Sequence, residues 1–270
     1  MEIAGRVTTG CLDFARHDKQ CRMTKREKDL WQGIDPSASG ALTARDYRSA
    51  SFAQEISQRG VDAGELLAAD RTQRRIKEAS IPGVEVFARK VHPQHHRGFF
   101  GEFVRRDEGI LARIGLWPRQ WSTARLFAGT AKGFHVHPPS IPENCDPVDW
   151  LRGLYVSEPD NYSARSYDNE QWDVMFFIQG RFEIILFDIR AGLPRRVMRF
   201  FVDGDNHRSN NNVGVVIPPG VAHAIRVEGT EDAIMVYGTS TVFRPEFEGR
   251  IASEVETAAL PESWRKFLSL

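Results

Sequence analysis

The pattern of hydrophobic and polar positions divides the chain into two parts. Residues 1–80 are charged, and apolar residues recur at rough helical spacing over 46–58 and 62–79. Asp62, followed by Glu65 three residues later, is similar to a capping box. We therefore predict weak order before residue 40, then two helices. Residues 1–80 would form a partly helical extension that serves as an appendage or an arm.

From Ile81 onward the chain is a series of short strand-like runs. Gly-containing turns separate several of them, and many short strands with regular turn signals are typical of a β-sandwich or a jelly-roll barrel. The predicted fold class is therefore all-β over 81–251, with the helical extension before it. The expected strands are 84–91, 98–105, 124–131, 132–137, 173–180, 181–190, 195–202, 213–219, 223–229 and 233–243.

Two segments depart from this pattern. Residues 138–170 are polar and Pro-rich, and they are long for a loop. Their aromatic residues (Trp150, Tyr155, Tyr162 and Tyr167) predict a partly ordered cover over the barrel mouth. Residues 252–270 form a C-terminal tail that we expect to be helical over about 260–268.

Composition narrows the functional classes. Lys plus Arg and Asp plus Glu both number 36, so bulk charge does not favour binding to nucleic acid or membranes. The chain has 3 cysteines at irregular spacing, which is neither a disulfide framework nor a zinc motif. The first residues lack the pattern of a signal peptide, and no apolar run is long enough to span a bilayer. We expect a cytoplasmic protein.

Four residues suggest a metal site. His135 and His137 form a His-x-His pair, which on a strand places both imidazoles on one face. Asp173 begins the next predicted strand, and His223 follows a Pro-Pro-Gly turn. Three neutral imidazoles and one carboxylate suit a divalent transition metal such as Fe, Mn, Zn, Ni or Co. The alternative is four unrelated residues on barrel strands. No organic cofactor is expected.

Five ordered elements carry a resemblance to a known family. They are Pro82-Gly83-Val84 with Arg97-Gly98-Phe99-Phe100-Gly101-Glu102, the block from Gln120 through Arg125 to Lys132-Gly133-Phe134-His135, the strand 180–190, the turn 217–223, and Tyr237 followed by 243–246. In these elements residues 81–251 resemble the dTDP-4-dehydrorhamnose 3,5-epimerases. The resemblance implies a double-stranded β-helix (cupin jelly roll) and a homodimer.

The same resemblance implies roles for individual residues. His135 would be the catalytic base and Tyr237 the acid, with Lys132 contacting a phosphate or an oxyanion. The segment with Arg97 and Glu102 would reach toward the nucleotide of a bound sugar, often across the dimer. In the second block, Gln120 and Arg125 would also bind the substrate.

The chain departs from the family at positions that matter for chemistry. Lys132, His137 and Asp173 replace an arginine, a glutamine and a lysine of the family pattern. The aspartate that orients the catalytic histidine falls in register with 252–255, so its role is missing or passes to Glu254. The changes at 137 and 173 turn an epimerase-type site toward the metal-binding pattern of other cupins.

Three functional hypotheses follow. The first is an isomerase or epimerase that acts on a keto-sugar, free or nucleotide-linked, by proton transfer next to a carbonyl with the help of a metal. The second is a metal-dependent cupin oxygenase or lyase acting on a small molecule. The third is a non-catalytic sugar-binding cupin, since fold alone does not determine function.

Overall fold

Two antiparallel five-stranded sheets form the body of the molecule. The computed structural model describes residues 80–207, 209, 211–250, 262–264 and 266–268. One sheet has the order β1-β9-β6-β11-β4, built from β1 (Glu85–Ala88), β9 (Val213–Ile217), β6 (Asp173–Gln179), β11 (Ala233–Thr239) and β4 (Gln120–Leu126). The other has the order β12-β5-β10-β7-β8, built from β12 (Gly249–Arg250), β5 (Ala131–Val136), β10 (Val221–Glu228), β7 (Arg181–Asp188) and β8 (Val197–Asp203).

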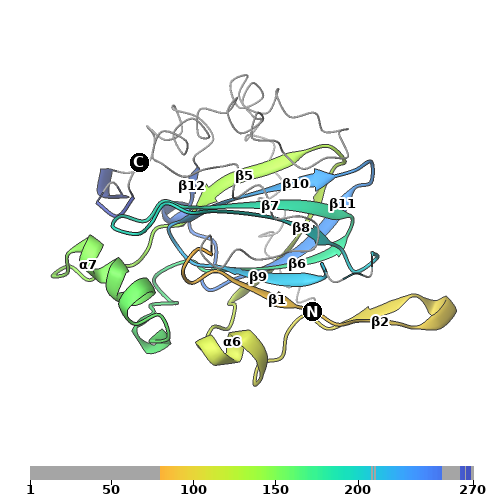
Figure 1. Ribbon diagram of the computed structural model, residues 1–270, viewed down its shortest axis with the longest axis horizontal. Coiled ribbons are helices and arrows are strands. Elements are labelled where there is room, and N and C mark those ends of the chain that lie inside the picture. Colours follow the sequence, from red (N-terminus) through yellow and green to blue (C-terminus); the bar gives the residue numbers. More distant parts are fainter. Residues whose placement is uncertain (1–79, 208, 210, 251–261, 265, 269–270) are drawn as a thin grey trace, which may run out of the picture.

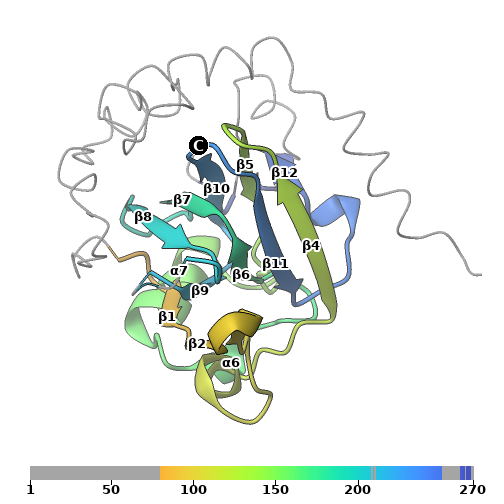
Figure 2. The same cartoon turned by 90° about the vertical axis from the view of Figure 1, so that its right-hand side faces the viewer.

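The two sheets lie face to face and enclose an apolar core between them (Figures 1 and 2). Alternate residues of each strand enter this core, as the period of two along a strand requires. Met175 and Phe177 of β6 meet Ile184 and Leu186 of β7 there. The remaining residues face outward into a second apolar cluster. This jelly-roll arrangement confirms the predicted all-β fold.

Most predicted strands correspond to observed ones with small shifts at their ends. Two are much shorter than predicted, because the run 84–91 contains β1 (Glu85–Ala88) and the run 98–105 contains a strand only over Phe99–Gly101. The clearest difference is the run 124–131, which was expected to be one strand. Instead, β4 begins at Gln120 and ends at Leu126, and the chain then turns, with Thr130 N donating to Phe127 O at 3.1 Å. Gly129 has a φ of 70°, which β-branched residues rarely adopt, so the turn divides this run. Residues 1–79 and 251–261, with the predicted extension and most of the tail, lie outside the described residues.

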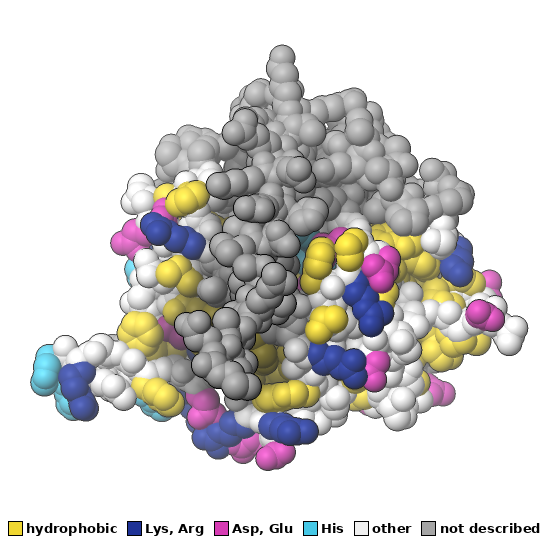
Figure 3. Space-filling model, turned by 180° about the vertical axis from the view of Figure 1, so that it is seen from behind, with side chains coloured by type: hydrophobic (Ala, Val, Ile, Leu, Met, Phe, Trp, Pro, Cys, Tyr) yellow, Lys and Arg dark blue, Asp and Glu magenta, His cyan; other side chains and the backbone are white. Residues whose placement is uncertain are grey.

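A two-stranded hairpin projects from the barrel (Figure 1). It consists of β2 (Val91–Pro93) and β3 (Phe99–Gly101), joined by a short 3-10 turn (His95–Arg97). Its histidines and arginine gather at the end of the projection, as Figure 3 shows from behind. Phe99 and Phe100 on β3 are exposed. A short helix, α6 (Gly109–Ile114), follows and buries Leu111 and Ile114 against the outer apolar cluster.

The insertion 138–170 is ordered, but it packs on a different side from the one expected. It contains α7 (Pro147–Arg152), a π turn (Gly153–Ser157) and a 3-10 turn (Tyr162–Ala164). Tyr155 and Tyr167 pack against Trp172, with ring centroids 6.5 and 5.4 Å away. These contacts belong to the outer cluster, so the aromatic residues cover the outside of β6 rather than the space between the sheets.

Two short elements complete the described chain. A 3-10 turn (Pro245–Phe247) leads into β12, and another (Glu262–Trp264) lies within the predicted tail, of which too little is described to test a helix. Within the described ranges, the structure contains no helix of the length and apolarity needed to cross a bilayer.

Candidate active site and metal centre

Three strands bring the candidate residues to one end of the inter-sheet space. His135 on β5 lies directly opposite His223 on β10. Asp173, the first residue of β6, lies opposite Ile217, whose side chain belongs to the inter-sheet core. Residues directly opposite each other on antiparallel strands project to the same face. The carboxylate of Asp173 therefore points into the space that the histidines line.

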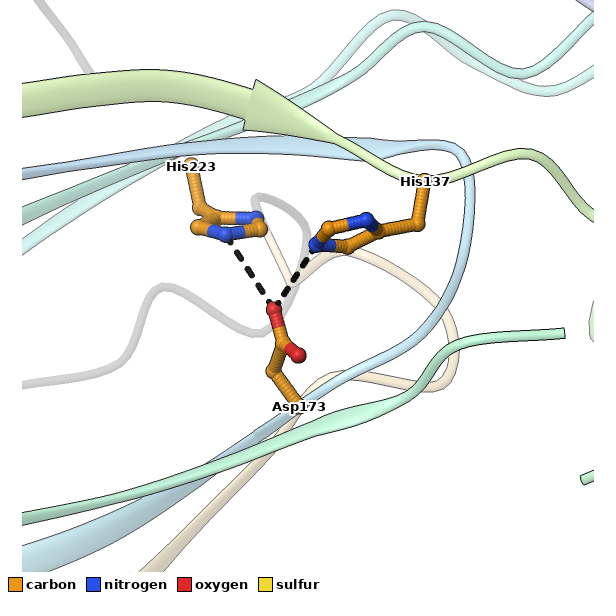
Figure 4. Close-up of side chains that lie close together, drawn as sticks. All are labelled: His137, Asp173 and His223. Atoms are coloured by element: carbon orange, nitrogen blue, oxygen red, sulfur yellow. Dashed lines mark hydrogen bonds and ion pairs between the residues drawn. The ribbon is translucent and has the colours of Figure 1, made fainter. Parts of the chain in front are cut away.

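His137, Asp173 and His223 converge on one point (Figure 4). Asp173 Oδ2 lies 3.2 Å from His137 Nε2 and 3.2 Å from His223 Nε2. The three possible ligand atoms are all within 4.8 Å of one another, and all three side chains are buried. The predicted fourth ligand, His135, lies outside this group. Its ring stacks on that of His223, with centroids 5.9 Å apart.

The two imidazoles face more oxygens than their protons can satisfy. Besides the two contacts with Asp173, His137 Nδ1 lies 2.8 Å from Phe247 O, and His223 Nδ1 lies 3.2 Å from Val221 O. Carbonyl and carboxylate oxygens only accept, so the four contacts require four N–H groups, whereas a neutral imidazole has one. A cation near the two Nε2 atoms would remove this conflict, because the contacts at Nε2 would then need no N–H groups.

The pKa values of these groups place the conflict at His223. Burial acts to lower the pKa of His137, but the charges of Asp173 and Glu248 outweigh burial and raise that pKa to about 9. Burial lowers the pKa of His223 to about 4, so this imidazole is neutral at pH 7. Burial also acts to raise the pKa of Asp173, but His137 outweighs it and lowers that pKa. His223 therefore brings one proton to two oxygens.

A divalent cation fits the arrangement. If each histidine keeps its Nδ1–H on a backbone carbonyl, both Nε2 lone pairs and Asp173 Oδ2 point to a common centre. Metal-bound histidines usually donate their other N–H to a carbonyl or carboxylate in this way. Nitrogen and oxygen ligands at about 2.0–2.2 Å from one ion lie roughly 3.0–3.5 Å apart. The two observed separations of 3.2 Å fall in this range.

His135 has a carboxylate partner that sequence reasoning missed. Glu248 Oε2 lies 3.4 Å from His135 Nδ1, and its Oε1 lies 3.9 Å from His137 Nδ1. Burial acts to raise the pKa of Glu248, but the hydrogen bond with His135 and the neighbouring imidazoles outweigh it and lower the pKa. Glu248 is thus ionised at pH 7. The expected substitute, Glu254, lies outside the described residues, and the carboxylate that contacts His135 is that of Glu248.

A β-bulge turns Lys132 toward the same space. Between His223 and Ile225 the pairing of β10 with β5 shifts, so that Ile225 faces Lys132 although His223 faces His135. Two residues of β5 therefore oppose the single residue Ala224. Because Ile225 belongs to the inter-sheet core, its partner Lys132 also projects inward. Lys132 is partly buried.

The facing sheet contributes Tyr237 and Gln120. Tyr237 on β11 lies opposite Ser122 and Met175, and it packs against the inter-sheet core. Gln120 on β4 accepts a hydrogen bond from Phe243 N at 2.9 Å through its side-chain oxygen. Both residues line the inner face of their sheet, so the two walls of the space carry polar groups.

Three predicted substrate-binding residues lie elsewhere. Arg125 lies between Ala124 and Leu126, which pack on the inter-sheet core, so it projects to the outer face and binds Asp232 at 2.6 Å. This position contradicts a contact between Arg125 and a substrate inside the barrel. Arg97 is exposed in the hairpin turn, and Glu102 is exposed and pairs with Arg105. Within one chain, neither Arg97 nor Glu102 lies beside the histidines of the candidate site.

A second missed residue is Gln171. Its Nε2 lies 3.0 Å from Asp173 Oδ1 and 3.1 Å from His137 Nε2. The signal for it was present, because residues two apart on an extended segment share a face. Glu248 gave no comparable signal, since it precedes a strand of only two residues that pairs with β5.

No protein-family model matches the chain. The spore coat polysaccharide biosynthesis protein SpsL of Bacillus subtilis (strain 168) is 28% identical over 179 residues, which is 66% of this chain and 93% of that protein.

Solved structures similar to this chain include sugar epimerases. The rmlC epimerase of Mycobacterium tuberculosis has a TM-score of 0.46 and 19% identity, covering 64% of this chain and 70% of that one. The 3'-monoepimerase ChmJ of Streptomyces bikiniensis, in complex with dTDP-quinovose, has a TM-score of 0.46 and 20% identity, covering 68% and 76%.

Proposed function

We propose that this protein is a sugar epimerase or isomerase that moves a proton on a carbon next to a carbonyl group of a keto-sugar, free or nucleotide-linked. One observation carries the proposal. His135, with Glu248 on its Nδ1, faces a space whose opposite wall carries Tyr237. A base and an acid on two walls are what inversion at carbon needs. The similarity to a polysaccharide biosynthesis protein supports a sugar substrate.

His135, Lys132 and Tyr237 each have a separate role in the proposed reaction. With Nδ1–H directed at Glu248, His135 Nε2 is the basic atom, and it removes the proton from the carbon next to the carbonyl. The electron pair of the C–H bond moves onto the carbonyl oxygen, where the ammonium group of Lys132 stabilises the negative charge. Tyr237 then donates its hydroxyl proton to the opposite side of the carbon. Solvent returns that proton to Tyr237, and His135 loses its own.

The metal is part of the proposal. His137, His223 and Asp173 would hold a divalent transition metal, and the excess of oxygens over protons around the two imidazoles supports this assignment. A bound cation would supply Lewis-acid chemistry, which polarises a carbonyl and stabilises an enolate. His135 would then serve the proton transfer rather than complete the ligand set.

A second candidate function follows from the same three residues. Two histidines and one carboxylate are the ligand set of many non-haem Fe(II) oxygenases. The second hypothesis is therefore Fe(II)-dependent oxidation of a small molecule with O₂ as the oxidant. Consumption of O₂ that depends on Fe(II) and substrate would favour it, whereas proton exchange under argon would favour the epimerase.

The assembly is also a proposal. The projecting hairpin, with Arg97 at its turn and the exposed Phe99 and Phe100, is the part of the chain that would reach a second copy in a homodimer. Light scattering of the purified chain, compared with a variant in which both phenylalanines are replaced by serine, tests this assembly. A monomeric unaltered chain would contradict it.

The experiment for the reaction is hydrogen exchange in D₂O. Purified protein is incubated with a panel of free and nucleotide-linked keto-sugars, and deuterium on carbon is followed by NMR. Exchange should occur at one carbon beside the carbonyl, with inversion at that carbon. The Tyr237→Phe variant should retain exchange but lose inversion. No exchange with any member of the panel would leave the sugar-binding hypothesis.

A further inference from the structure

Gln171 is a buried residue beside the candidate metal ligands that the proposed proton transfer does not use. Its side chain is 5% exposed. It donates through Nε2 to Asp173 Oδ1 at 3.0 Å, whereas the other oxygen, Oδ2, faces both imidazoles. Asp173 thus presents one carboxylate oxygen to an amide and the other to two imidazoles.

The backbone around Gln171 is held in place from the neighbouring strand. Trp172 N donates to Ser240 Oγ at 2.8 Å, and that hydroxyl donates to Glu170 O at 2.7 Å. Ser240 N donates in turn to Trp172 O at 3.0 Å. The Trp172 indole N–H binds the Glu170 carboxylate at 2.9 Å. These bonds fix the residues on both sides of Gln171, so its amide has a defined position.

The chemical effect concerns how Asp173 can bind a cation. A carboxylate can offer one or both oxygens to a metal. An oxygen that already accepts an N–H hydrogen bond is less available as a ligand. The same hydrogen bond also keeps the carboxylate plane from rotating. The amide of Gln171 therefore favours binding through Oδ2 alone. Such outer contacts are known to change metal affinity by about 10–100-fold.

We propose that Gln171 is a positioning residue that restricts Asp173 to one-oxygen coordination, so that His137, His223 and a single oxygen hold the cation and further coordination positions remain for a substrate oxygen. This inference rests on the metal site of the proposed function. Gln171 would thereby keep coordination positions of the cation free for a substrate.

The amide has a second contact that makes the test informative. Gln171 Nε2 also lies 3.1 Å from His137 Nε2, the atom that a cation would use. This close contact with His137 Nε2 must be given up when a cation binds, whereas the hydrogen bond to Asp173 Oδ1 can remain. If competition with the cation were its main effect, removing the amide would strengthen metal binding. If positioning is its main effect, removal weakens binding.

The experiment compares Gln171→Met with the unaltered full chain in titrations with Zn(II) and Co(II). Methionine fills similar volume but has no N–H donor. We expect affinity to fall by about 10–100-fold. We also expect the visible absorption of bound Co(II) to weaken, because Asp173 would then supply a second oxygen and raise the coordination number. Gln179→Met, at the exposed end of β6, is the matched control and should change neither.

The outcomes separate this inference from the metal site itself. If the unaltered chain binds neither ion, both fail together. If it binds and Gln171→Met binds equally well or more tightly with the same spectrum, the metal site stands and the role of Gln171 is wrong. Thermal melting in the presence of a chelator shows whether the variant folds. Gln171→Leu serves as the second variant if Gln171→Met does not.

Discussion

His135 and His223 lie directly opposite each other on neighbouring strands, with ring planes 16° apart and centroids at 5.9 Å. One ring belongs to the pair with Glu248, and the other belongs to the group around Asp173. The stacked contact therefore joins the proposed proton-transfer residue to the candidate metal ligands. A substitution in one group should therefore also affect the other group, so tests of either group need matched controls.

Replacing His137 with glutamine should abolish metal binding without unfolding the barrel. The substitution removes the Nε2 donor, so the loss should exceed the roughly 10–100-fold cost of outer-shell changes. Metal per chain, counted by elemental analysis after dialysis, measures the effect. His207→Gln, in a partly exposed loop, is the control. Metal retained in the His137 variant would contradict the ligand set.

Replacing Glu248 with glutamine should slow deuterium exchange by about 100-fold or more, because His135 loses the carboxylate that orients its ring and stabilises its protonated form. Metal content should remain near that of the unaltered chain. Glu246→Gln changes an exposed residue of the preceding turn and should have no effect. Equal rates in the two variants would remove Glu248 from the mechanism.

Gly220→Ala should destabilise the protein more than Gly229→Ala. Both glycines have positive φ, 76° and 91°, so both substitutions strain the backbone. Only at Gly220 would the added Cβ overlap Arg190, since nothing lies near Gly229. The difference in free energy of unfolding should be about 1–3 kcal/mol in urea denaturation. Metal affinity should fall only at Gly220, whose N–H binds His137 O at 2.8 Å. Equal stability losses would show that Arg190 moves aside.

The Asp232→Asn variant should lose stability in a pH-dependent way. The hydrogen bonds from Ala128 N and Arg125 lower the pKa of Asp232 below its ordinary 3.8. A lowered pKa contributes stability above the unfolded value, and that contribution is lost as pH falls through the folded value. The variant should therefore be less stable than the unaltered chain at pH 7, and the gap should close toward pH 3. A gap that persists at low pH would mean that charge is not the cause.

The sequence predicted the strands well because their alternation has a simple period. His137, Asp173 and His223 could be placed together from that period and from the turn before His223. Arg125 was assigned to a substrate from the family block, although the alternation with Leu126 already pointed it outward. Glu248 could not be found, because it is held by a two-residue strand whose pairing with β5 is long-range.

The bulge in β5 has a consequence at the level of the gene. A regular strand through His135 would turn Lys132 outward, and the extra residue at 133–134 restores it to the inner wall. Deletion of the Gly133 codon would leave both side chains on that wall and remove only the bend. Insertion of one codon at the same place would also separate the two side chains by an even number of positions, so only a strand without the bulge would keep both on that wall. The present odd spacing of Lys132 and His135 thus requires the bulge, whereas a strand one residue shorter or longer would have to be regular.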